Sequence, residues 1–216
     1  MPALSSVERK SLGKRVAAYE DQLLSPEGSA QLDYLTEDRG LTLETISRFR
    51  LGAVVHPEES DGISQGKVTI PYLTMSGPVG LRFRALPGMD GPKYYAPAGS
   101  KLTIFNVNQF TIPKGWIVIT EGEIDCITAV QAGLPAVGLP GVSSWRDYYR
   151  LVFDGYERVI ILADADDKGQ GKGFAEKIAE HVPAPAIFPM PDGHDVNSFV
   201  KEHGADALFE HLKIKR

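Results

Sequence analysis

The chain has 216 residues, of which 43% are hydrophobic, and it carries 23 lysines and arginines against 28 aspartates and glutamates. This length and composition can bury one large core or two modest ones. Neither a signal peptide nor an apolar span of about eighteen residues is present, so we expect a cytoplasmic protein without a membrane partner. The single Cys126 excludes an internal disulfide, and no Cys/His spacing is typical of a zinc ribbon.

The N-terminal half contains a locally basic segment in a chain that is acidic overall. Between residues 62 and 112 the only acidic residue is Asp90, whereas the basic residues are Lys67, Arg82, Arg84, Lys93 and Lys101. Arg82 and Arg84 would share one face of a strand, while Phe83 would point to the other face and into the core. Such a face can bind phosphate groups. The alternative is a solvated strand edge whose charges block pairing with another strand.

Two stretches of this half have the composition of loops. Residues 57–66 are polar and residues 85–100 are rich in glycine and proline, so we expect both to be mobile. Within the second stretch, Tyr94 and Tyr95 could stack on bases or could simply pack against the protein. Neither loop is long enough to separate two domains clearly. We place the domain boundary between residues 112 and 113, just before the next predicted strand.

Two acidic clusters each follow a run of β-branched and apolar residues. Glu121 and Asp125 come after residues 116–120, and Asp164 and Asp166 come after residues 159–162. Both runs have the length and composition of buried parallel strands. Because open α/β sheets bind ligands at the carboxyl ends of their strands, we expect both clusters at one edge of the sheet.

Converging carboxylates repel one another unless they are protonated or a cation holds them. Oxygen ligands suit Mg²⁺ or Mn²⁺, so the two clusters predict a site for one of these ions. The alternative is that these residues are ordinary loop residues and helix caps.

Helices and a further strand are predicted around the acidic clusters. Residues 126–133 predict a helix that ends at glycine, residues 134–139 a strand, and residues 174–181 another helix. This alternation of strands and helices predicts a parallel sheet. Residues 168–173 do not have the spacing of a phosphate-binding loop, because no hydroxyl follows Lys172. Their glycines should instead allow a tight turn after the second cluster.

The acidic clusters resemble the motifs of the TOPRIM domain, which DnaG-type primases, topoisomerases and some nucleases share. Its E-G-x-x-D turn is matched by Glu121, Gly122 and Asp125, and its D-x-D motif by Asp164 and Asp166.

A third motif of the primases, D-G-x-D-P-D, is similar to the sequence that begins at Asp192 and includes Asp195. Asn197 stands where the last aspartate is expected, and its amide oxygen would be only a weak metal ligand. His194 lies inside this motif and could approach the metal site, whereas His203 fits a surface or helix position.

The N-terminal half distinguishes among the TOPRIM families. Residues 17–24, 30–35, 39–41 and 44–52 resemble the helical opening of a DnaG primase core, and residues 67–106 resemble the segment that supplies basic residues to the template groove. The resemblance covers about residues 15–205. It implies an α/β protein: a Rossmann-like TOPRIM parallel sheet flanked by helices in residues 113–216, preceded by a smaller mixed α+β N-terminal subdomain in residues 1–112.

The resemblance also implies a function, namely a DNA primase core that makes short RNA primers on single-stranded DNA from ribonucleoside triphosphates, with Mg²⁺ or Mn²⁺. The implied catalytic residues are Glu121, Asp125, Asp164 and Asp166, and the implied metal ligands are Glu121, Asp164, Asp166 and Asp195. The residues expected to bind nucleic-acid or nucleotide phosphate are Arg82, Arg84, Lys93 and Lys101.

Primases of this family usually carry a zinc-binding module and often a helicase region, and neither is found in this sequence. We therefore expect a bare catalytic core, from a phage or a bacterium, whose partners include a separate zinc-ribbon protein and a replicative helicase. Two alternatives stay open: a metal-dependent TOPRIM nuclease and a noncatalytic DNA-binding replication module. A topoisomerase is disfavoured because no tyrosine is singled out as a nucleophile.

Overall fold

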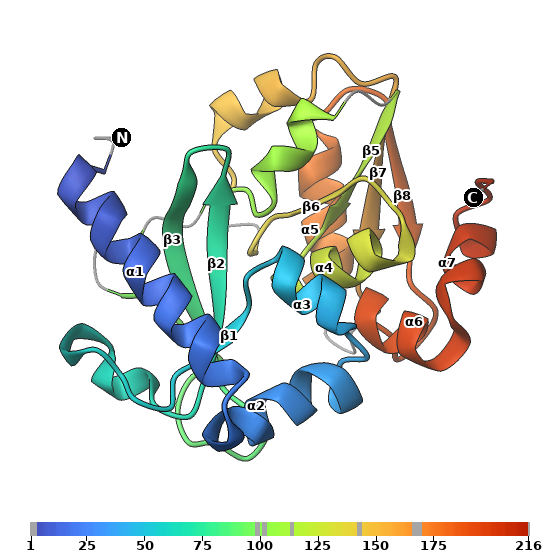
Figure 1. Ribbon diagram of the computed structural model, residues 1–216. Coiled ribbons are helices and arrows are strands. Elements are labelled where there is room, and N and C mark those ends of the chain that lie inside the picture. The colour runs from blue at the N-terminus through green and yellow to red at the C-terminus, as the bar shows by residue number, and fades with distance from the viewer. Residues whose placement is uncertain are drawn as a thin grey trace. The chain divides into compact units, whose positions relative to one another are not determined.

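The computed structural model describes residues 4–97, 100, 103–112, 115–141, 144–165 and 170–215. The chain divides into two compact units, Met1–Lys101 and Leu102–Arg216 (Figure 1). The sequence places the boundary later, after residue 112. Residues 103–112 belong with the second unit because Phe105 pairs with Gly138 and the side-chain amide of Asn106 donates to the Ala136 carbonyl.

The first unit is built on an antiparallel sheet of four strands. Its order is β1 (Gly52–Ala53), β2 (Val68–Thr74), β3 (Gly77–Arg84) and β4 (Tyr94–Tyr95). The long helix α1 (Ser6–Leu23) begins at a capping box formed by Ser5 and Glu8. Its buried residues Val16 and Tyr19 share a core cluster with Phe83 of β3, as expected for the face of β3 opposite Arg82.

Short helical segments complete the first unit. They are η1 (Pro26–Gly28), α2 (Ser29–Asp33), η2 (Tyr34–Asp38), α3 (Leu43–Arg48) and η3 (Glu59–Ser64). Thr42 caps α3 by accepting a hydrogen bond from the backbone nitrogen of Thr45. The predicted helical opening of this half is therefore confirmed.

A buried carboxylate anchors the segment that contains η3. Asp61 is fully buried, Nη2 of Arg15 lies 2.6 Å from both of its oxygens, and the Tyr19 hydroxyl donates to it at 2.7 Å. Burial, reinforced by the bond to Asp61, raises the pKa of Tyr19 to about 12, so the hydroxyl keeps its proton at neutral pH. These bonds tie the centre of residues 57–66, the polar segment expected to be mobile, to α1.

The second unit contains the predicted parallel sheet. Its strands are β5 (Trp116–Thr120), β6 (Ala136–Gly138), β7 (Arg158–Ala163) and β8 (Pro185–Pro189), in the order β6-β5-β7-β8, and all neighbouring pairs are parallel. The strand β8 was not predicted, because prolines are unfavourable in strands. It lies at the edge of the sheet, where a missing backbone N–H can be tolerated.

The helical elements of the second unit are η4 (Val107–Thr111), α4 (Glu123–Ala132), η6 (Asp147–Val152), α5 (Gln170–Ala179), α6 (Val196–His203) and α7 (Ala205–His211). Ile119 of β5, Ile161 of β7 and Phe174 of α5 belong to one buried cluster. Both predicted helices begin earlier than expected, α4 at Glu123 and α5 at Gln170. In the described part of the chain, no helix combines the length and the apolar character needed to cross a membrane.

We predict that Asp61→Asn lowers the free energy of unfolding by about 2 kcal/mol, because the Arg15 guanidinium and the Tyr19 hydroxyl lose a charged acceptor. Urea denaturation measures the change. The matched control is Glu27→Gln, since Glu27 pairs with His56 on the surface, where the side chains are 62% and 74% exposed. Its effect should stay below about 0.5 kcal/mol. Equal effects of the two variants would contradict a stabilising role for the buried pair.

Candidate active site

Glu121 and Asp164 lie at one edge of the parallel sheet. Glu121 directly follows β5 and Asp164 directly follows β7. These strands are parallel neighbours, with Ile119 opposite Ile161, so their carboxyl ends coincide, as the sequence predicted. Both side chains are half-buried, and the Oδ1 oxygen of Asp164 is buried.

The turn after β5 is shaped by a glycine. Gly122 is the N-cap of α4, and a Cβ atom at this position would lie 2.8 Å from Oδ2 of Asp125. Glycine therefore lets the carboxylate of Asp125 fold back over the start of the helix. Asp125 is only 8% exposed, and its Oδ1 accepts a hydrogen bond from the backbone nitrogen of Asn197 at 3.1 Å. Asp125 thus connects the first turn of α4 to the first turn of α6.

Asn197 has a structural position. It is 1% exposed, and its side-chain nitrogen donates to the Thr128 hydroxyl of α4 at 2.8 Å. Asn197 replaces the last aspartate of the D-G-x-D-P-D motif. It is not at an exposed metal-binding position, because its hydrogen bonds join α6 to α4.

Asp195 caps α6. Its Oδ1 accepts from the backbone nitrogen of Ser198 at 2.7 Å, and the Ser198 hydroxyl accepts from the backbone nitrogen of Asp195 at 3.0 Å. The preceding residue links this motif to the D-x-D cluster, because the carbonyl of His194 accepts from the backbone nitrogen of Ala165 at 3.0 Å. The third acidic motif is thus held beside the second by the backbone.

The predicted catalytic and metal-binding residue Asp166 lies outside the described residues. Within the described ranges, Glu121, Asp164 and Asp195 do not bring three ligand atoms close enough together to form a compact metal group. Half-buried carboxylates at a strand edge are nevertheless the hard oxygen ligands that Mg²⁺ and Mn²⁺ prefer, so the donor set at this edge fits such an ion.

A glycine in α5 allows the helix to begin against the backbone of Asp164. A Cβ atom on Gly171 would lie 2.2 Å from the carbonyl oxygen of Asp164 and 2.7 Å from its nitrogen. Gly171 thus serves close packing, and the tight turn that the sequence predicts after the second cluster lies outside the described residues.

A second group of candidate side chains lies in the first unit around two tyrosines. Arg84 is only 4% exposed; its Nε donates to the Tyr34 hydroxyl at 2.5 Å and its Nη1 donates to the Tyr94 hydroxyl. The strand β3 that carries it is paired on both sides, with β2 and with β4. The alternative of a solvated strand edge is therefore wrong for Arg84.

Other cations gather on the same tyrosines. Nε of Arg39 donates to the Tyr34 hydroxyl at 2.8 Å, and the Arg82 guanidinium lies 4.0 Å from the centre of the Tyr94 ring. The amine of Lys93, which is exposed, lies 6.0 Å from the same ring. We define Arg39, Arg82, Arg84, Lys93, Tyr34 and Tyr94 as the arginine–tyrosine cluster. Such concentrated positive charge suits phosphate groups.

The sequence indicates no role for Arg39 beyond its place in residues 39–41, which resemble part of a primase core. Nothing in the local sequence shows that Arg39 and Arg84 donate to the same tyrosine hydroxyl. Lys101, the remaining predicted phosphate ligand, lies outside the described residues. Lys67 is 6% exposed and donates to the Ile63 carbonyl at 2.6 Å, and Tyr95 stacks on Phe83, so both contribute to packing.

We predict that Gly171→Ala destabilises the chain by about 2 kcal/mol or more, because the new methyl group meets the backbone of Asp164 and cannot be accommodated without moving α5. Gly173→Ala is the matched control in the same helix, since a Cβ there has no neighbour within 4 Å. It should be neutral or stabilise by about 0.5–1 kcal/mol through helix propensity. Thermal unfolding of both variants provides the comparison. A neutral Gly171→Ala would contradict the close approach of α5 to Asp164.

Comparisons with known proteins agree with this architecture. The model of the Toprim-like family matches residues 118–200. The chain is 42% identical to the Gene 57 protein of Mycobacterium phage D29 over 68% of this chain and 99% of that protein. It is 24% identical to the DNA primase of Pasteurella multocida over 94% of this chain, which spans 42% of that primase.

Solved structures with the same fold include the RNA polymerase domain of Mycobacterium tuberculosis primase DnaG. The TM-score is 0.79 at 20% identity, over 97% of this chain and 84% of that one. A DnaG primase catalytic domain bound to single-stranded DNA gives a TM-score of 0.74 at 23% identity, over 97% of this chain and 82% of that one. From its Toprim segment, its relatives and its fold, the chain belongs to the DnaG-type primase catalytic cores that contain a TOPRIM domain.

Proposed function

We propose that this chain synthesises short RNA primers on single-stranded DNA by nucleotidyl transfer from ribonucleoside triphosphates. The observation that supports this most directly is the position of Glu121 and Asp164 at one edge of the parallel sheet. The likeness to DnaG catalytic cores along nearly the whole chain adds to this support. The chain spans 42% of the length of the DNA primase of Pasteurella multocida.

The acidic edge would carry the chemistry of the reaction. Primer synthesis joins a 3′-hydroxyl to an α-phosphate and releases pyrophosphate, so charge must be neutralised on the phosphates. Mg²⁺ or Mn²⁺, when bound, would supply that neutralisation and would make the hydroxyl more acidic. Glu121, Asp164, Asp166 and Asp195 are the carboxylates proposed to hold it.

The first two acidic residues would have different roles. Glu121 is half-buried at the end of β5, where its carboxylate can hold a cation or take up a proton from the 3′-hydroxyl. Asp125 is nearly buried and bonded to the backbone of Asn197. We therefore assign Asp125 the role of a positioning residue that fixes the turn carrying Glu121.

The arginine–tyrosine cluster would bind phosphate groups of the template or of the incoming nucleotide. Hydrogen bonds from Arg39 and Arg84 to the Tyr34 hydroxyl hold both guanidinium groups in place before any ligand arrives. Preorganised guanidinium groups lose less side-chain entropy on binding than free ones. Lys101 is proposed as a further phosphate ligand. A separate zinc-ribbon protein and a replicative helicase are the protein partners we propose.

The proposal is tested by incorporation of labelled ribonucleotides on single-stranded DNA with Mg²⁺ or Mn²⁺, with and without an annealed primer. Asp164→Asn should reduce synthesis at least about 100-fold because it weakens binding of the cation, while binding of single-stranded DNA is retained. The matched control is Asp154→Asn, since Asp154 is exposed before the amino end of β7, at the opposite end of the same strand. That variant should keep full activity.

The products distinguish the remaining possibilities. Extension that occurs only from an annealed primer would support a polymerase core that needs a separate initiation module. Metal-dependent cleavage of the template without incorporation would replace the proposal with a nuclease. DNA binding without turnover would indicate a noncatalytic replication module.

Lys93 provides a separate test of the phosphate contacts. Its side chain is exposed, so Lys93→Ala should leave stability unchanged while lowering the salt dependence of single-stranded DNA binding by about 0.7 in log–log slope. Titrations at several salt concentrations measure this slope. Lys10→Ala, which removes an exposed lysine from α1, is the control and should leave the slope unaltered. Identical slopes for all three proteins would remove Lys93 from the DNA-binding surface.

A further inference from the structure

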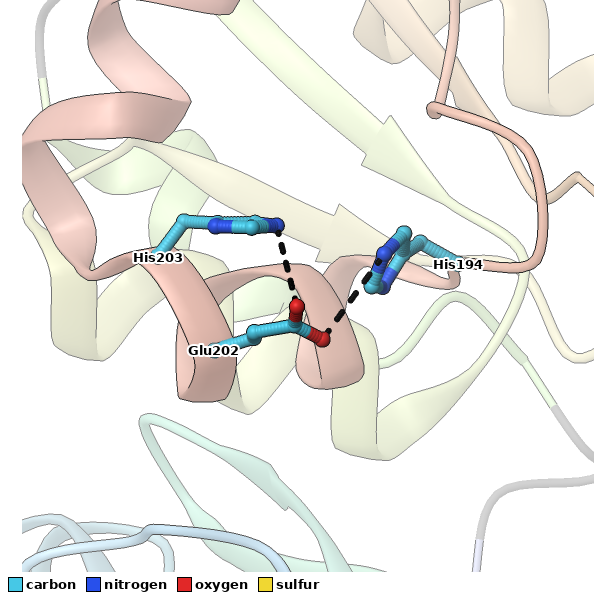
Figure 2. Close-up of side chains that lie close together, drawn as sticks. All are labelled: His194, Glu202 and His203. Carbon is cyan, nitrogen blue, oxygen red and sulfur yellow. Dashed lines mark ion pairs between the residues drawn. The ribbon is translucent and has the colours of Figure 1, made fainter.

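A second group of potential metal ligands lies at the carboxyl end of α6. Figure 2 shows His194, from the loop that precedes the helix, facing Glu202 and His203 at the helix end. Nε2 of His194 lies 3.9 Å from Oε2 of Glu202, and Nε2 of His203 lies 3.7 Å from Oε1 of Glu202. One ligand atom from each of the three residues lies within 4.8 Å of the others. The sequence showed no such group, because these residues are separated by a whole helix.

These distances are close to those that a single ion requires. Two ligand atoms about 2.0–2.1 Å from a tetrahedral Zn²⁺ lie about 3.4 Å apart. Glu202 is 64% exposed and His203 is 42% exposed, so both side chains are free of tight packing and can close the separation from at most 4.8 Å to about 3.4 Å. Two imidazoles and one carboxylate form a ligand set that binds Zn²⁺ and leaves a position for water.

The surroundings of His194 determine which of its two ring nitrogens is directed at Glu202 and His203. Its Nδ1 is buried and has no hydrogen-bond partner in the described part of the chain, so Nε2 is the nitrogen directed at Glu202. The ring packs edge-to-face against Phe199 at 5.8 Å and against the His203 ring at 5.5 Å. These contacts restrict the rotation of His194 before any ion is bound.

The position at a helix end also favours a cation. Glu202 and His203 are in the last turn of α6, whose C-cap is Gly204. The carbonyl groups of a last helical turn carry partial negative charge that attracts positive ions.

We propose that His194, Glu202 and His203 form a site for a late first-row divalent cation, represented by Zn²⁺, which is separate from the carboxylate edge. Imidazole ligands distinguish it from a site for Mg²⁺, which prefers oxygen. The bound ion would link the end of α6 to the loop that contains His194. Because the His194 carbonyl accepts a hydrogen bond from the nitrogen of Ala165, this link would also brace the loop between Asp164 and Asp166.

The experiment is a titration of the full chain with Zn²⁺ in a chelator-free buffer that contains excess Mg²⁺. We expect one Zn²⁺ per chain, a rise in melting temperature, and visible d–d absorption when Co²⁺ replaces Zn²⁺. His194→Ala and His203→Gln should each lower the affinity for Zn²⁺ at least about tenfold. His203→Gln keeps the side chain polar at an exposed position, so it tests the ligand without disturbing the fold.

Two controls decide whether the effect belongs to this group. His56→Ala removes a surface histidine that also pairs with a glutamate, and it should bind Zn²⁺ like the parent chain. Asp164→Asn should also retain Zn²⁺, and its loss there would place the ion at the carboxylate edge and overturn the proposal. Equal affinities for the parent chain, His194→Ala and His203→Gln would overturn it as well.

The bracing effect has its own measurement. Hydrogen exchange at the backbone amide of Ala165 should slow when Zn²⁺ is added to the parent chain and should not change in His203→Gln. Unaltered exchange in the parent chain, with Zn²⁺ bound, would remove the link to the D-x-D loop.

Discussion

The parallel pairing of β5 with β7 is the constraint on which the acidic site depends. Glu121 and Asp164 are more than forty residues apart in the chain, and each simply follows its strand. The register that sets Ile119 opposite Ile161 brings the two strand ends to the same edge. After its first residue each of these strands is buried on both faces, so packing on the two sides of the sheet holds that register. The packing of the core beneath the carboxylates thus offsets the repulsion between them.

Hydrogen bonds between helices extend this arrangement to the third motif. Asp125 and Thr128 of α4 contact Asn197 of α6, and all three side chains are buried. A buried donor that lost its acceptor would cost about 1–3 kcal/mol, so the two helices are strongly held in one arrangement. The loop before α6 is in turn joined to Ala165, because the carbonyl of His194 accepts a hydrogen bond from the backbone nitrogen of Ala165. The acidic edge is consequently supported on its α6 side by polar contacts, in addition to the apolar core of the sheet.

In the arginine–tyrosine cluster, tyrosine side chains hold positively charged groups in place. Tyrosine hydroxyls accept hydrogen bonds from Arg39 and Arg84 while the Tyr94 ring faces Arg82. Neutral acceptors and aromatic faces fix the direction of these guanidinium groups. The cluster therefore restricts the movement of its cationic side chains.

The sequence by itself determined the strands β5 and β7, the parallel sheet, the acidic edge and the alternation of Arg82 and Phe83, because each depends on a short-range period or on the chemistry of neighbouring residues. Tertiary structure alone decided the burial of Arg84, the hydroxyl that Arg39 shares with it, the contacts of Asn197 and the anchoring of Asp61. It also decided the strand β8 and the meeting of His194 with His203. These features depend on partners distant in the chain, and local propensity contains no information about which segments will become neighbours.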